Sequence, residues 1–95
     1  MGRYADRVHS DPTVIQRLKQ LQLELSGEME VELTLQDGRI LRGTVPERPT
    51  LQLFRNEREE EGVNGLLRLD DAEDPTRSQL LWLDQIQHVQ RLGSA

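Results

Sequence analysis

The sequence predicts a mainly β fold with one helix (α+β): an N-terminal α-helix, then a strongly bent five-stranded antiparallel sheet that forms an open barrel. Three observations predict this class. Apolar residues first repeat at helical spacing, the period then becomes alternating, and turn residues divide the remainder into short strands. The 95 residues suffice for one domain, so we assign 1–95 to a single domain.

The helix is expected at residues 12–25. Asp11 is a favourable N-cap and Pro12 a favourable first helical residue. The apolar positions that follow share helical spacing: Val14, Ile15, Leu18, Leu21 and Leu25. Gly27 is suited to close the helix, because glycine adopts the left-handed conformation easily. Residues 1–10 show no period, and we expect a loosely ordered lead-in there.

A hairpin is expected next, and the bent sheet as a whole at residues 29–92. Residues 29–35 alternate between apolar and polar, which is typical of a half-buried strand, and Asp37 and Gly38 lead into a second strand at 39–45. A two-residue loop would oppose Leu33 to Arg42 on the buried face. A three-residue loop with Gly38 as a bulge is therefore favoured.

The bulged hairpin fixes a register that the structure can test. It sets these pairs: Leu33 with Leu41, Met29 with Val45, Glu32 with Arg42, and Val31 with Gly43. A glycine inside a strand usually marks a sharp bend or a close backbone approach.

The remaining strands are short. They are expected at 50–55, 66–69, 79–83 and 86–92, with acidic loops at 56–65 and 70–78. In the strand expected at 50–55, Leu51 and Leu53 lie on the same face. The link at 84–85 has room only for a turn or a single helical turn.

Composition excludes several classes of protein. The chain has no cysteine, which removes disulfides and thiolate chemistry, and its longest apolar run is too short to cross a membrane. We expect a cytoplasmic protein without a membrane partner. The formal net charge of -5 argues against simple nucleic-acid binding, although much of the acidic excess falls in 57–61 and 70–74.

No catalytic or metal-binding pattern is present. The acidic segment 70–74 lacks the glycine and the distal glutamate of a calcium-binding loop. His9 and His88 are far apart in the sequence, and no nucleophile arrangement or phosphate-binding loop accompanies them. We therefore expect no enzyme activity, no metal site and no cofactor.

Two stretches resemble the sequence motifs of Sm-like proteins, including the bacterial Hfq type. In the first, residues 31–45, alternating aliphatics lead into Asp37-Gly38-Arg39, and Gly43 follows where the second Sm-like strand bends. The second, 81–89, has two short strands around a tight turn. The chain also resembles an uncharacterised family of small bacterial proteins with a variant of this fold.

The resemblance implies RNA binding at the pore of a ring, with Gln52 at the Asn position of the motif and Glu47 or Arg48 near the Asp position. The candidate RNA-binding residues near this loop are Arg48, Gln52 and Arg55. The Arg-Gly pair that RNA-binding members commonly carry in the second motif is absent. Our first expectation is therefore an interaction module that associates with itself, as a dimer or a ring, or with an unknown protein. Its interface candidates lie on the apolar edge strands: Leu81, Trp82, Leu83 and Val89.

Overall fold

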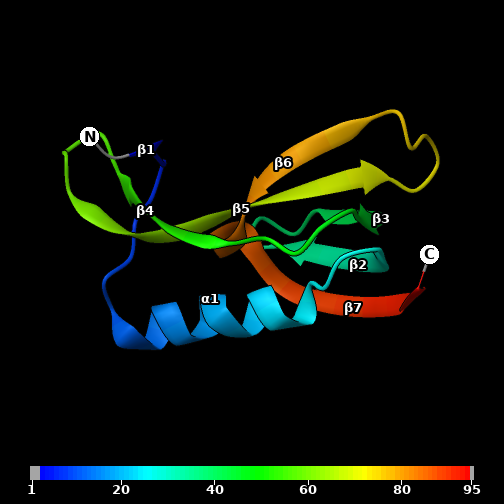
Figure 1. The fold of residues 1–95 in the computed structure, drawn as a ribbon, viewed down its shortest axis with the longest axis horizontal. Helices are drawn as coiled ribbons and strands as arrows, with labels where there is room; N and C mark the ends of the chain where they lie inside the picture. Colours follow the sequence, from blue (N-terminus) through cyan, green and yellow to red (C-terminus); the bar gives the residue numbers. More distant parts are fainter. Residues whose placement is uncertain (1–2, 95) are drawn as a thin grey trace.

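The computed structural model describes residues 3–94 and contains one helix and one bent sheet (Figure 1). The elements are β1 (Arg3–Tyr4), α1 (Pro12–Glu24), β2 (Met29–Leu35), β3 (Ile40–Val45), β4 (Leu51–Arg55), β5 (Glu61–Asp71), β6 (Ser78–Trp82), the 3-10 turn η1 (Leu83–Gln85) and β7 (Ile86–Ser94). The strand order is β1-β4-β5-β3-β2-β7, with β6 paired to β5. The predicted class is confirmed, but the sheet has seven strands rather than five.

The helix begins where the sequence predicted. The Asp11 side chain accepts a hydrogen bond from the Thr13 amide at 2.8 Å, which satisfies one of the free N–H groups of the first turn. The buried side of α1 carries Leu18 and Leu21, and Leu25 is buried at the helix end. The main core lies between α1 and the sheet, and its members are Leu18, Leu21, Leu25, Val31, Leu33, Leu35, Val45, Leu67, Leu69, Leu81, Leu83, Ile86 and Val89.

The β2–β3 hairpin has the predicted bulged register. Leu33 pairs with Leu41, Met29 with Val45, Glu32 with Arg42 and Val31 with Gly43. Gly38 has a φ of +91°, a conformation that side chains with a Cβ rarely adopt. A glycine in the turn is what the bulge requires, so the local chemistry sets the register of both strands.

The glycine within β3 marks a close approach, as expected. At this point β3 meets β5, where Gly43 pairs with Asp71 and Thr44 with Asp70. A Cβ on Gly43 would overlap the carbonyl oxygen of Asp70 and lie 3.0 Å from a side-chain carbon of Leu69. The absence of a side chain therefore allows the two strands to meet at the bend.

β5 is longer than the sequence indicated. It was predicted as an acidic loop at 56–65 followed by a strand at 66–69, but the strand runs from Glu61 to Asp71. Its first half pairs with β4 and its second half with β6. Gly62, Asn64 and Gly65 weaken the local strand signal, and pairing with β4 and with the lead-in outweighs it.

Residues 3–10 of the lead-in are ordered against the sheet, unlike the loose segment predicted at 1–10, of which residues 1–2 lie outside the described residues. β1 pairs in parallel with β4, and Ala5 is fully buried. His9 forms an antiparallel bridge with Val63, with N–H···O distances of 3.0 and 2.7 Å in the two directions. The lead-in thus crosses from β4 to β5. The segments that pair with the lead-in lie far along the chain, so local periodicity in the sequence does not predict this pairing.

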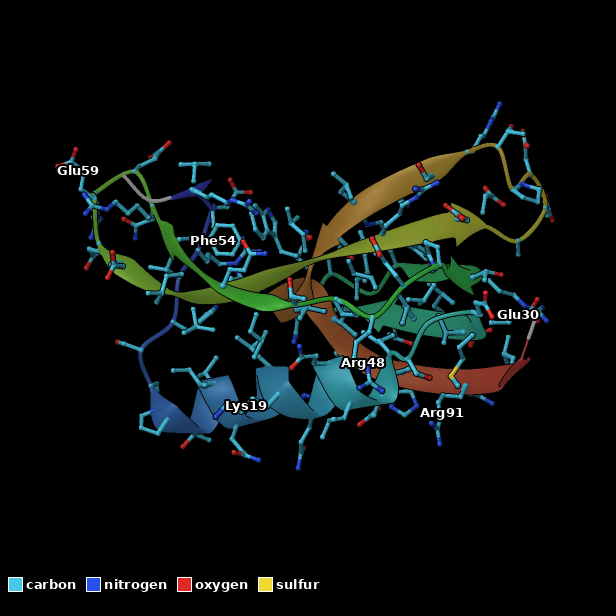
Figure 2. All side chains as sticks on the ribbon, in the orientation of Figure 1. Lys19, Glu30, Arg48, Phe54, Glu59 and Arg91 are labelled. Atoms are coloured by element: carbon cyan, nitrogen blue, oxygen red, sulfur yellow. The ribbon has the colours of Figure 1, made fainter. Side chains whose placement is uncertain are left out.

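The buried side chain of β4 is Phe54, not Leu53. Leu53 is 58% exposed, whereas Phe54 is 3% exposed. The Phe54 ring meets Trp82 edge to face, with centroids 5.3 Å apart. Phe54 and Ala5 are buried but are not part of the main core, so a second, smaller apolar cluster forms where the lead-in crosses the sheet. Figure 2 shows Phe54 among the side chains between β1 and β4.

Candidate functional site

Three strands have a free edge within residues 3–94, and one of them, β1, pairs only with β4 and has just 2 residues. β6 pairs only with β5, and β7 pairs only with β2. The turn η1 joins them directly, so both edges belong to the C-terminal part of the chain. An unpaired strand edge presents main-chain N–H and C=O groups that another strand can bind.

The edge of β6 lacks the features that usually prevent pairing with another chain. Its sequence, Ser-Gln-Leu-Leu-Trp, contains no charge and no proline. Leu80 is 67% exposed, Trp82 is half-buried, and both lie on one face of the strand. Leu66 on β5 pairs with Trp82 and is 38% exposed. We call Leu66, Leu80 and Trp82 the β6 patch.

Three of the four predicted interface side chains lie inside the protein. Leu81, Leu83 and Val89 belong to the core, and only Trp82 reaches the surface. A contact with a second chain through β6 can therefore use main-chain groups or the β6 patch, but not the buried side chain of Leu81. The sequence prediction missed Leu80 and Leu66. The strict alternation of β6 could have identified Leu80, because it follows from Leu81 facing the core.

The three RNA-binding candidates do not form one surface. Gln52 and Arg55 are separated by an odd number of positions on β4 and so face opposite sides of the sheet. Gln52 accepts a hydrogen bond from Arg3 at 2.7 Å, and Arg55 is 3.9 Å from Glu61. Arg48 lies in the loop beside Gly27 at the end of α1, and Figure 2 shows it away from Phe54 of β4.

A polar cluster forms where the lead-in meets η1. The Arg7 guanidinium donates two hydrogen bonds to the carboxylate of Asp84, at 2.8 and 3.0 Å. The His9 ring nitrogen Nε2 lies 2.8 Å from the same carboxylate. The side chain of Asp84 is only 7% exposed, so this carboxylate is almost enclosed by its partners.

The charge of Asp84 is stabilised by these contacts. Burial raises the pKa of Asp84, but the hydrogen bonds from Arg7 and His9 outweigh it and leave the pKa below its ordinary value. The hydrogen bond to Asp84 in turn raises the pKa of Arg7. Asp84 is therefore ionised over the physiological range and holds the lead-in against η1.

A cleft of about 490 Å³ lies beside this cluster. Its lining comes mainly from the lead-in, α1 and η1, with one residue each from the β2–β3 turn and β7: Arg7, His9, Thr13, Val14, Arg17, Leu18, Leu21, Gln36, Leu83, Asp84 and Ile86. The sequence prediction missed this site, because its residues come from distant segments and follow no motif.

The acidic loop between β5 and β6 is stabilised by its own carboxylates. Asp71 accepts a hydrogen bond from the Glu73 amide at 2.8 Å, and Asp74 accepts one from the Thr76 hydroxyl at 2.6 Å.

Among the described residues no three His, Asp or Glu side chains are grouped so that they could hold a metal ion. None of the helical residues described forms a segment with the length and apolarity that a membrane crossing requires.

Comparison with known proteins identifies a family and a structural relative. The family model described as Domain of unknown function (DUF3247) matches residues 2–92. A crystal structure from Xanthomonas campestris, described as a novel variant of the Sm-like motif, is 38% identical, with a TM-score of 0.89 over 95% of this chain and 97% of that one. No curated protein matches the chain. The chain thus has a variant Sm-like fold and belongs to the DUF3247 family.

Proposed function

We propose that the protein is a non-catalytic interaction module that pairs with a second copy of itself through the free edge of β6. The observation that carries this proposal is the uncharged edge strand Ser78–Trp82, which bears the exposed side chain of Leu80. Antiparallel pairing of two copies of β6 satisfies main-chain groups on both and buries the two β6 patches together. Such an interface has twofold symmetry and closes as a dimer.

The edge of β7 is less suited to pairing. Two register shifts interrupt its ladder with β2, and bulges of this kind twist an edge away from regular pairing. Gln87 lies at one of these shifts, and its carbonyl already accepts a hydrogen bond from Arg17 at 2.6 Å. Arg91 adds a charge to the strand. These features favour a β6–β6 dimer over a ring in which β6 of one copy pairs with β7 of the next.

The native mass in solution tests the proposal. Light scattering is expected to give twice the 11.0 kDa of one chain, with dissociation on dilution. A strictly monomeric protein would contradict self-association. A larger closed ring would retain self-association but contradict the β6–β6 arrangement.

A charged substitution on the edge tests the location of the interface. Leu80→Lys is expected to give a monomer with unchanged thermal stability of the isolated chain, because Leu80 is 67% exposed and its replacement leaves the core intact. Leu53→Lys is the matched control, since Leu53 is 58% exposed on a strand away from the β6 edge. Equal dissociation of both variants would exclude the β6 patch as the interface.

RNA binding remains a prediction of the resemblance to Sm-like proteins. Titration of fluorescent short single-stranded RNA at two salt concentrations tests it, because phosphate contacts make binding weaken with salt. Salt-sensitive binding that is lost in an Arg48→Gln variant would favour an RNA-binding regulator over a protein interaction module.

A further inference from the structure

The cleft beside Arg7, His9 and Asp84 combines an apolar floor with a polar rim. The floor consists of the half-buried Val14 and of four core side chains that are at most 2% exposed: Leu18, Leu21, Leu83 and Ile86. Its volume of about 490 Å³ lies within the range typical of small-molecule sites, about 300–1,000 Å³. Pockets of this kind bind the apolar part of a ligand on the floor, while a few polar groups fix its orientation.

The carboxylates in and near the cleft already have partners. Asp84 is bound by Arg7 and His9, at 2.8 Å for the shortest contact of each. Asp11 accepts the hydrogen bond that caps α1, and Asp37 accepts from the main chain and side chain of Arg39, at 3.1 and 2.8 Å. The charges of Asp84 and Asp37 are therefore matched by neighbouring cationic side chains, and that of Asp11 is stabilised by the N-terminus of α1.

Among the charged groups on the rim of the cleft, Arg17 has no oppositely charged partner within the described part of the chain. Its guanidinium donates to the carbonyl oxygen of Gln87 at 2.6 Å, and that acceptor is neutral. Across residues 3–94 no carboxylate lies within ion-pair distance of Arg17. The positive charge of Arg17 therefore lines the cleft without a counter-charge, and most of its N–H groups are free to donate.

We propose that this cleft binds a small carboxylate that carries a short aliphatic chain. The carboxylate accepts hydrogen bonds from the free N–H groups of Arg17, since guanidinium groups bind carboxylates with two parallel hydrogen bonds. The aliphatic chain lies on the floor between α1 and η1, where it is removed from water. The site is separate from the β6 edge and does not depend on the proposed dimer.

A titration followed by NMR tests the proposal with octanoate as the probe. We expect saturable shifts of the backbone amides of Leu18 and Leu83 in the full chain, while the amides of β3, which contributes no residue to the cleft, remain unchanged. Acetate lacks the chain, octanol lacks the charge, and octylamine inverts it, so each is expected to bind at least about tenfold more weakly. No shift with octanoate, or equal shifts with octanol, would overturn the proposal.

Two substitutions on the same helix locate the carboxylate. Arg17→Gln is expected to weaken octanoate binding about tenfold, the loss typical of one charge-assisted hydrogen bond. Lys19→Gln removes the same charge from α1 but lies outside the cleft lining, and Figure 2 shows Lys19 on the helix surface, so its affinity should stay unchanged. Both residues are exposed, so neither change should impair folding. Equal affinities of the two variants would exclude Arg17 as the anchor.

Discussion

The β2–β3 hairpin and the lead-in are both fixed on the sheet, but by contacts of different range. The hairpin pairs two strands that a single tight turn connects. The lead-in is held by residues far along the chain: Asn64 donates to the carbonyl of Arg7 across 57 positions, and His9 contacts Asp84 across 75. Closing the long loops that these contacts require therefore costs more conformational entropy than closing the hairpin turn.

The difference between the two regions predicts how each responds to substitution. Hairpin positions that touch nothing outside the hairpin should be tolerant, because the turn alone holds their register. Positions that join distant segments should be sensitive, because each supports contacts that no local preference supplies. The following predictions use the free energy of unfolding from urea titration as the common measurement.

The largest loss is expected where the hairpin meets β5. Gly43→Ala places a Cβ against the main chain of Asp70 and the side chain of Leu69, and the main chain cannot move without disturbing the bend. We expect a loss of about 3 kcal/mol. A loss below about 1 kcal/mol would show that the β3–β5 crossing adjusts easily, and that the bend is not set by close packing.

The second largest loss is expected at Asp84. Asp84→Asn keeps the shape of the side chain but removes the charge that Arg7 and His9 bind, and we expect a loss of about 2 kcal/mol. The estimate is below that of a fully buried pair because the Arg7 side chain is half-exposed.

Asp37→Asn provides the matched control for the Asp84 variant. Asp37 also binds an arginine, Arg39, but the pair is local and both side chains are more than half exposed. We expect a change within about 0.5 kcal/mol. Equal losses in the two variants would contradict the distinction between local and distant contacts.

The pH dependence of stability has a defined sign at Asp84. Its pKa in the folded protein lies below the ordinary value of 3.8, so the unfolded chain takes up the proton first as the pH falls. The stabilisation is complete above that ordinary value and is lost as the pH falls through the folded pKa. The difference in unfolding free energy between the wild type and Asp84→Asn should therefore stay constant down to about pH 4 and shrink as the pH falls further. A difference that stays constant well below the ordinary pKa of Asp84 would exclude the ionised carboxylate as its source.

The same contrast explains what the sequence could predict. The register of Leu33 and Leu41 follows from alternation and one glycine, both of them local. The burial of Phe54 in place of Leu53 depends on Trp82, whose ring packs against it. The core position of Leu83 likewise depends on α1, which packs against η1. A single sequence shows that such residues are apolar, but not which neighbour covers them.

A smaller loss is expected at Asn64, the buried polar side chain that holds the lead-in to β5. Asn64→Ala removes the 2.9 Å hydrogen bond to the Arg7 carbonyl and should cost about 1.5 kcal/mol. Hydrogen exchange should accelerate at the amides of Ala5 and His9, which bond to Arg55 and Val63, but much less in the hairpin. Equal acceleration in both regions would show that they unfold as one unit.

A smaller loss again is expected for Gly38, at the turn of the hairpin. Gly38 has a φ of +91°, and a Cβ built there would have no neighbour within 4 Å, so Gly38→Ala adds backbone strain without a clash. We expect a loss of about 1 kcal/mol, and a smaller one for Gly38→Asn, because asparagine tolerates the left-handed region better. A loss above about 2 kcal/mol for alanine would mean that the glycine does more than relieve strain. The turn would then be needed to select the register itself, and the hairpin would depend on one residue as strongly as the lead-in depends on its distant partners.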